Sequence, residues 1–196
     1  MMNNPETRNL RQQILSTANR LFIQEGYHGL SMRQISEALH ISKAALYYYF
    51  KDKEELYFAI LETYLDEMRV VLDRILADST TATNKICCFI EYILAQPTEK
   101  RAIIRLASQE IEQVSPPTRQ AFNIIYHQKF IRKIEAILKS GMEQGEFKRI
   151  NPEIATWTLL GMMYPYFYPA HAGSGALPEG TIREIITIYL EGINRK

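Results

Sequence analysis

The sequence predicts an all-α protein of about nine helices, with an N-terminal three-helix head and a larger helical body. Three observations support this fold class. Apolar residues recur at helical spacing along nearly the whole chain. Capping residues, prolines and glycines divide that pattern into segments. There is no internal repeat and no strand-like alternation of any length. We expect two domains, residues 1–52 and residues 53–196.

Composition is ordinary for a globular protein, with 46% hydrophobic and 23% charged residues in a chain of 196. The net charge of +1 argues against a sequence-neutral architectural DNA protein, which needs a far more basic surface. The small basic excess lies in residues 1–53, which hold seven Lys/Arg and four Asp/Glu. Cys87 and Cys88 are adjacent and have no other cysteine to pair with. A reduced, cytoplasmic location is expected, with no transmembrane segment and no signal peptide.

The first helix is expected to begin at Asn4 and Pro5, a cap followed by a proline, and to end near Glu25 before Gly26. A helix-turn-helix follows between Ser31 and Lys53. Ser31 and Gln34 form a capping box for its first helix, and Ser42 caps a second helix from Lys43 to about Phe50.

The second helix of this motif has two distinct faces. Leu46, Tyr49 and Phe50 are expected to face inward, while Lys43, Ala44, Tyr47 and Tyr48 lie on the opposite face. Lysine and tyrosine can contact phosphates, and a small alanine permits close approach to a DNA groove. This face therefore predicts a recognition helix, although an ordinary helical hairpin with packed tyrosines is the alternative.

The run LFIQEGYHGLSMRQISEALHISKAALYYYFKDKEEL resembles the N-terminal domain of the TetR family of bacterial transcriptional regulators. The resemblance covers about residues 8–60 and rests on Phe22, Gly26, Ser31, Ile35, Ala38, Ser42, Leu46, Tyr47, Phe50 and Lys53. Ala44 and Ala45 depart from the Gly-Thr often found there, so one hydroxyl for DNA contact is absent. The residues expected at the DNA surface are Ser31, Met32, Arg33, Ser42, Lys43, Ala44, Ala45, Tyr47, Tyr48 and Lys53. Lys53 is expected to anchor a phosphate at the start of the next helix.

The body begins with a long helix from Lys53, which Asp52 and Glu55 should cap. Further helices are expected at about 83–96, 98–113, 117–144, 152–164 and 181–193, with a loop at 169–180 and a bend at Pro165. The last two helices are apolar over a wide arc, which favours a homodimer interface, although plain core is the alternative. The expected interface residues are Trp157, Gly161, Tyr164, Ile182, Ile185, Ile186, Tyr189 and Ile193.

An effector cavity is expected in the body, and its ligand is a small molecule of unknown identity. The candidate lining residues are Tyr64, Met68, Phe89, Tyr92, Tyr126, Phe130, Trp157 and Met162, most of which could equally be core. The four histidines are scattered, and no nucleotide-binding loop or nucleophile elbow is present. No cofactor, metal or catalytic activity is expected.

The leading hypothesis is a dimeric transcriptional repressor that binds a palindromic double-stranded DNA operator and is released by an effector. The alternative is an α-helical small-molecule-binding protein or enzyme with a vestigial helix-turn-helix. Salt-dependent duplex binding separates the two, because only the repressor predicts it.

Overall fold

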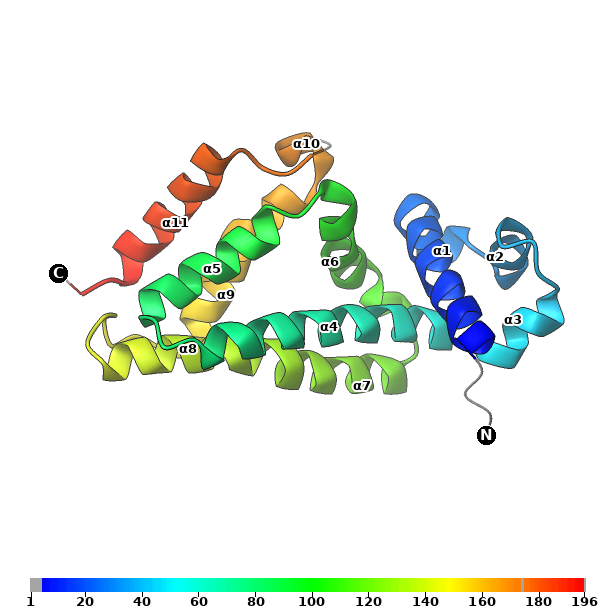
Figure 1. Ribbon diagram of the computed structural model, residues 1–196, viewed down its shortest axis with the longest axis horizontal. Helices are drawn as coiled ribbons and strands as arrows, with labels where there is room; N and C mark the ends of the chain where they lie inside the picture. Colours follow the sequence, from blue (N-terminus) through cyan, green and yellow to red (C-terminus); the bar gives the residue numbers. More distant parts are fainter. Residues whose placement is uncertain (1–4, 174, 196) are drawn as a thin grey trace. The chain divides into compact units, whose positions relative to one another are not determined.

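The computed structural model describes residues 5–173 and 175–195, and the regular structure in this part of the chain is helical (Figure 1). The expected cap at Asn4 lies outside the described residues. The α-helices are α1 (Pro5–Gly29), α2 (Met32–Ala38), α3 (Lys43–Tyr49), α4 (Lys53–Ala77), α5 (Ala82–Leu94), α6 (Thr98–Glu110), α7 (Pro116–Tyr126), α8 (Arg132–Glu143), α9 (Pro152–Met163), α10 (Pro169–Ala172) and α11 (Glu179–Ile193). Two 3₁₀ segments, η1 (Ile111–Gln113) and η3 (Tyr164–Phe167), and one π-helical segment, η2 (His127–Ile131), complete the list.

Most helix boundaries agree with the sequence pattern. Gly26 interrupts α1 with φ 72° and ψ 173°, a left-handed conformation that glycine adopts at little cost. Pro165 follows the end of α9, where the chain tightens into η3. Three details differ. The helix expected at 117–144 contains the π-helical turn η2, and α10 occupies part of the expected loop at 169–180. In α2, helical spacing predicts that Ala38 lies on the same buried face as Ile35, but Ala38 is exposed and Ser36 is buried.

Contacts divide the chain into two compact units. Unit 1 comprises Met1–Tyr64 and Leu106–Asn123, and unit 2 comprises Leu65–Arg105 and Ile124–Lys196. The expected domains divide the chain at one point, between residues 52 and 53. The compact units instead place the first half of α4 and the α6–α7 junction in the same unit as residues 1–52. Helices α4, α6 and α7 therefore each have residues in both units.

The core of unit 1 is built around aromatic rings. Phe22 and Tyr57 are fully buried and meet edge to face, with ring centroids 5.4 Å apart. Tyr27 meets the same Tyr57 ring at 5.1 Å. The Tyr57 hydroxyl donates to the carbonyl of Leu106 at 3.1 Å, so the start of α4 is joined to α6. Burial raises the pKa of Tyr57.

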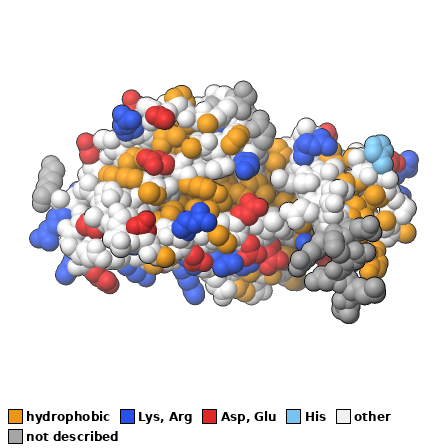
Figure 2. Space-filling view, viewed as in Figure 1, with side chains coloured by type: hydrophobic (Ala, Val, Ile, Leu, Met, Phe, Trp, Pro, Cys, Tyr) orange, Lys and Arg blue, Asp and Glu red, His pale blue; other side chains and the backbone are white. Residues whose placement is uncertain are grey.

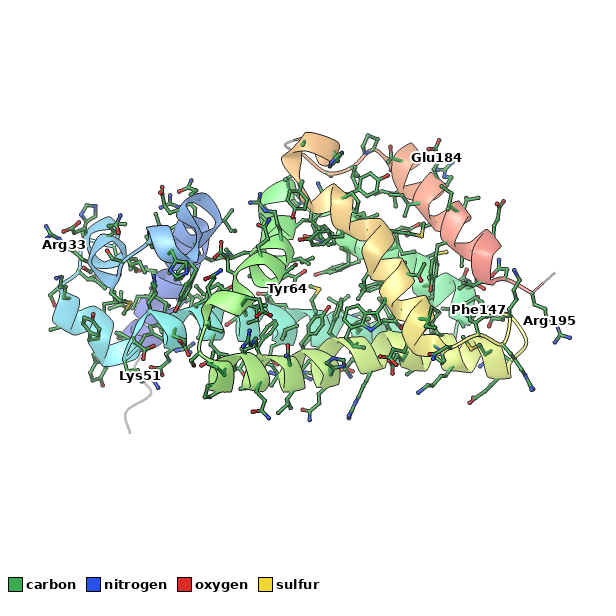
Figure 3. The ribbon with its side chains drawn as sticks, turned by 180° about the vertical axis from the view of Figure 1, so that it is seen from behind. Arg33, Lys51, Tyr64, Phe147, Glu184 and Arg195 are labelled. Atoms are coloured by element: carbon green, nitrogen blue, oxygen red, sulfur yellow. The ribbon has the colours of Figure 1, made fainter. Side chains whose placement is uncertain are left out.

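In unit 2, the helices α5, α8, α9 and α11 pack on one another. The Glu146 carboxylate accepts hydrogen bonds from the Ala82 and Thr83 N–H groups, both at 2.9 Å, and thereby caps α5. Phe147 follows directly and is buried beside Gly141 of α8. Phe147 and Asn194 form an isolated antiparallel bridge, and Figure 3 shows Phe147 and Arg195 at this end of the unit.

The loop before α11 is fastened to the end of α5 by a buried arginine. The Arg101 guanidinium donates to the carbonyls of Leu94 at 3.2 Å and Gly175 at 2.9 Å, and to the Thr98 hydroxyl at 3.0 Å. Thr98 in turn donates to Gly173 O at 2.8 Å.

Candidate nucleic-acid interface

Two serines set the geometry of α2 and α3. The Ser31 Oγ accepts from the Gln34 N–H at 3.3 Å, and the Gln34 Oε1 accepts from the Ser31 N–H at 2.9 Å. The Ser42 Oγ accepts from the Ala45 N–H at 3.1 Å and starts α3. Between the helices His40 has φ 54°, a left-handed turn residue. The sequence-predicted caps and the tight turn are confirmed.

The two faces of α3 separate largely as the sequence predicts. Leu46 and Phe50 are buried in the unit 1 core, whereas Tyr49, also expected to face inward, is half-buried. Lys43 and Ala44 are exposed, as are Tyr47 at 48% and Tyr48 at 80% exposure, while Ala45 is half-buried. Two large exposed aromatic side chains on one short helix are costly surface for a protein to leave in water, and they indicate an interaction site.

Helix α2 contributes less than expected. Met32 is 7% exposed and belongs to the core of unit 1, so it has no surface to offer DNA. It occupies the first helical position of α2, and its side chain is buried, as is that of Ile35. Arg33 is exposed and forms an ion pair with Glu37 at 2.7 Å. Figure 3 places Arg33 at the periphery of unit 1.

Lys53 differs most from its expected role. Its ammonium donates to the carbonyls of Tyr27 at 2.6 Å and Leu30 at 2.9 Å. The same ammonium lies 4.3 Å from the centroid of the Tyr27 ring, a cation–π contact. Burial lowers the pKa of Lys53, and the charge of Glu110 opposes that shift. The side chain ties the end of α1 and the α1–α2 loop to α4, so its ammonium is engaged within unit 1.

Lys51 was not among the residues expected at the DNA surface. It is exposed in the turn after α3, and Figure 3 shows it at the outer surface of unit 1. The Glu55 carboxylate accepts from the Lys51 N–H at 2.8 Å, and Asp52 accepts from the Glu55 N–H at 2.7 Å. This is the expected capping box, reaching one residue further. Because the turn is fixed by hydrogen bonds from backbone N–H groups, the Lys51 side chain is available to contact DNA. Its positive charge directly after α3 is the feature of the sequence that could have predicted this role.

Comparisons with known proteins agree with this geometry. Residues 14–60 match the profile of the bacterial regulatory proteins of the tetR family. Residues 79–166 match the profile of the tetracyclin repressor-like C-terminal domain. The chain belongs to the TetR family. It is a helix-turn-helix transcriptional regulator, and members of this family bind operator DNA, form dimers and take small-molecule effectors.

Individual relatives support the assignment along most of the chain. The transcriptional regulator YhgD of Bacillus subtilis is 23% identical over 92% of this chain and 94% of its own length. The TetR family regulator PfmR of Thermus thermophilus has a solved structure that matches with a TM-score of 0.77 at 28% identity, over 93% of this chain and 99% of that one. AibR, solved with isovaleryl coenzyme A and operator DNA, shares the fold with a TM-score of 0.73 at 24% identity, over 93% of this chain and 96% of that one.

The residues expected to line a TetR effector cavity fall into separate places. Met68, Phe89 and Phe130 are buried in unit 2, and Tyr92 and Met162 are half-buried. Tyr64 belongs to unit 1, apart from the others in the contact grouping. Figure 2 shows apolar side chains gathered over the α4–α5 face of unit 2, where the surface is hollowed.

Four of these aromatic side chains form a continuous cluster around η2. The Phe130 ring lies 5.8 Å from Phe89 and 5.5 Å from Tyr126, and Tyr126 lies 6.5 Å from Trp157. Burial raises the pKa of Tyr126 to about 12. A π-helical turn often marks a functional position. The position of η2 within this cluster therefore supports the cluster as a candidate effector site.

The residues expected at a TetR dimer interface divide into two groups. Ile182, Ile185, Tyr189 and Ile193 are core residues of this same chain, each at most 6% exposed, which corrects their assignment to the interface. The Tyr189 hydroxyl donates to Ala155 O at 3.0 Å, and burial raises its pKa. Tyr164 and Ile186 are half-buried.

The outward apolar positions of α9 and α11 are different residues. Ile154 is 65%, Trp157 43% and Ile188 63% exposed. A Cβ at Gly161 or Gly192 would meet nothing within 4 Å. Of the expected interface residues, Trp157 and Gly161 therefore lie on this outward surface.

Within the described residues, no group of three or more His, Cys, Asp or Glu side chains is placed to hold a metal ion. No helix in that part of the chain is long and apolar enough to cross a membrane.

Proposed function

We propose that this protein is a dimeric repressor that binds a palindromic operator through α3 and is released by a small-molecule effector held in unit 2. The exposed face of α3 carries the proposal. A lysine, a small residue and two tyrosines stand outward from a helix whose other face is buried, within a profile-matched TetR head. The protein would act in the cytoplasm, by binding and not by catalysis.

The DNA contacts are assigned by exposure. Lys43 and Lys51 supply phosphate contacts, and Ser31, Arg33 and Ser42 are placed to add others. Tyr47 and Tyr48 pack on sugars and thymine methyl groups. Ala44, also exposed, permits close approach of the helix to the groove, with Ala45 half-buried beside it.

The response to an effector rests on polar bonds within unit 1. The Glu54 carboxylate accepts from the Ser115 and Thr118 hydroxyls and from the Ser115 N–H at 3.2 Å. His28 and Gln113 are joined at 2.7 Å. These bonds link α1 and α4 to the α6–α7 junction. Since α6 and α7 continue into unit 2, an effector that displaces them would pull on the head.

The dimer is assigned to the outward apolar surface of α9 and α11, comprising Ile154, Trp157, Gly161, Ile188 and Gly192. Small residues on exposed helix faces permit close helix approach, and a two-fold axis through such a surface gives a self-complementary interface. Two recognition helices related by that axis would read half-sites about 34–36 Å apart, one turn of B-DNA, or a multiple of that distance.

Selection of bound fragments from random duplex DNA by the full-length protein tests this function. A palindromic consensus, bound at nanomolar protein and weakened by added salt, is expected. Fragments without a shared sequence would contradict the repressor proposal, as would binding of one half-site with the same affinity as two.

A further inference from the structure

Arg105 of α6 carries a buried donor that finds no acceptor among the described residues. Its Nε is shielded from solvent and has no hydrogen-bond partner in that part of the chain. The guanidinium lies 5.5 Å from the centroid of the Tyr168 ring. A cation–π contact offsets part of the charge, but it does not satisfy an in-plane N–H. Among the side chains that the structure describes, Arg105 has no carboxylate partner.

A second guanidinium lies one helical turn away on the same helix. Arg101 is 1% exposed and donates to oxygens of Leu94, Thr98 and Gly175. A guanidinium N–H that is buried without an acceptor is costly, so the Arg105 Nε favours an acceptor that carries negative charge. An oxyanion is the partner that this electrostatic environment favours.

Two phenol groups supply further donors beside Arg105. The hydroxyls of Tyr164 and Tyr168 are 2.9 Å apart, and one of them donates a hydrogen bond to the other. When Tyr168 donates to Tyr164, the Tyr164 O–H is left to donate to a ligand. A guanidinium next to a phenol hydroxyl is the donor set that binds carboxylate or phosphate oxygens.

The surroundings of this cluster are apolar. Phe167 is 4% exposed and meets Tyr164 edge to face at 6.1 Å, and Met163 is fully buried. These residues, from the end of α9 and from η3, are apolar and lie next to the hydroxyl pair. A ligand here therefore has an anionic head and an apolar tail.

We propose that Arg105, with the Tyr164–Tyr168 hydroxyl pair, binds the head group of an amphipathic organic anion, either a carboxylate or a phosphate ester. This inference deepens the proposed function, since it rests on unit 2 holding the effector. It predicts that the protein distinguishes an anion from a neutral or cationic molecule of the same length.

Isothermal titration of the full-length protein with octanoate, octyl phosphate, octanol and octylamine tests the inference. Octanoate or octyl phosphate is expected to bind at least about tenfold tighter than octanol and octylamine, the effect of one charge-assisted hydrogen bond. The tighter of the two anions identifies the head group as carboxylate or phosphate. Equal affinity for octanol, or saturable binding of none of the four, would overturn the assignment.

Variants locate the site. Arg105→Gln should reduce the affinity for the anion to that for octanol, with an unchanged circular dichroism spectrum. If that variant does not fold, Arg105→Lys serves, because it keeps the charge and should retain the preference for anions at lower affinity. Arg132→Gln, an exposed arginine of α8, is the matched control and should bind as wild type does. An Arg105→Gln protein that folds and keeps the preference for anions would refute the site.

Operator binding without any probe separates this inference from the proposed function. Anion-selective binding by a protein that selects no palindrome would leave the site standing and reject the repressor. A protein that selects a palindrome but does not distinguish octanoate from octanol would reject the site alone.

Discussion

Lys43 and Tyr47 lie on the exposed face of α3, and neither side chain is part of the core. We expect Lys43→Ala and Tyr47→Phe each to weaken operator binding without lowering the thermal midpoint. Lys43→Ala should also reduce the slope of log affinity against log salt by about one, since one phosphate contact is lost. Fluorescence anisotropy at several salt concentrations measures both effects.

The matched control for this pair is Lys139→Ala, an exposed lysine on α8 in unit 2. It removes the same charge from the chain but should leave the salt slope unchanged. An equal change of slope in both lysine variants would mean that net charge, and not α3, governs the affinity.

Lys53 stabilises unit 1 through its ammonium, which two carbonyls and one aromatic ring surround. Lys53→Met should lower the free energy of unfolding by about 1–2 kcal/mol, because the Tyr27 and Leu30 carbonyls lose their donor in a half-buried place. Urea denaturation measures the loss. A variant with wild-type stability and a flatter salt slope would restore Lys53 as a phosphate anchor.

At the scale of elements, the α5 cap couples stability to pH. Burial raises the pKa of Glu146, but hydrogen bonds from Thr83 and Ala82 outweigh it and leave the pKa below its usual value. A depressed folded-state pKa contributes stability above the unfolded-state value, and this contribution is lost as the pH falls through the folded-state value. We therefore expect unfolding free energy to decline below about pH 4.5, with Glu146 among the causes.

Glu146→Gln tests that coupling, since the amide keeps an acceptor for one N–H but cannot ionise. It should cost about 1–2 kcal/mol at neutral pH, and the difference from wild type should shrink in acid. Glu143→Gln, three residues earlier and exposed, is the control. A difference from wild type that stays constant from pH 7 to pH 3 would contradict the assigned role of the carboxylate.

Helix α8 has no room for a side chain at Gly141. A Cβ there would lie 2.3 Å from Cδ2 of Phe147 and 2.8 Å from Cβ of Ala82. Gly141→Ala should destabilise the protein by about 1–3 kcal/mol through overpacking. Gly180→Ala near the start of α11 meets nothing within 4 Å and should be neutral or stabilising. Chemical denaturation of the two variants checks the contrast, and equal effects would show that Phe147 moves aside freely.

Local sequence chemistry predicted the element boundaries well, because capping residues act within one turn. Ser31, Ser42 and Asp52 each accept a hydrogen bond from a backbone N–H three residues further on. These bonds depend on local spacing in the sequence and not on distant contacts. The π-helical turn η2 could not be predicted. One extra residue in a turn leaves the helical periodicity nearly intact, so no local signal in the sequence marks the position of η2, where Phe130 and Ile131 are buried.

Side-chain direction was harder to predict wherever two environments favour the same residue. A methionine at the first turn of α2 suits either a DNA surface or a core, and Met32 is core. A lysine at a helix start suits a phosphate, yet carbonyls of a preceding loop occupy Lys53. The burial of Met32 and the hydrogen bonds of Lys53 depend on residues distant in the sequence, and helical periodicity does not predict such contacts.

For the whole molecule, the same ambiguity affects the dimer. The wide apolar arc of α11 predicts that more than one side of the helix is buried. Periodicity does not say whether a residue on that arc is buried by its own chain or by a second copy. Ile182, Ile185, Tyr189 and Ile193 are covered from within, and Ile188 is left outward. An interface centred on the first group would require the core to open.

The oligomer prediction therefore concerns Ile188 and Trp157. Ile188→Glu and Trp157→Glu should each yield a folded monomer and abolish tight operator binding, because a charge at a two-fold interface meets its own copy. Tyr189→Glu should instead unfold the protein, since Tyr189 is 2% exposed and bonded to Ala155. Val70→Glu, at a position 48% exposed on α4, is the matched control and should remain dimeric. Sedimentation velocity distinguishes these states. Dimers of unchanged affinity in both the Ile188 and Trp157 variants would place the two-fold axis on another surface.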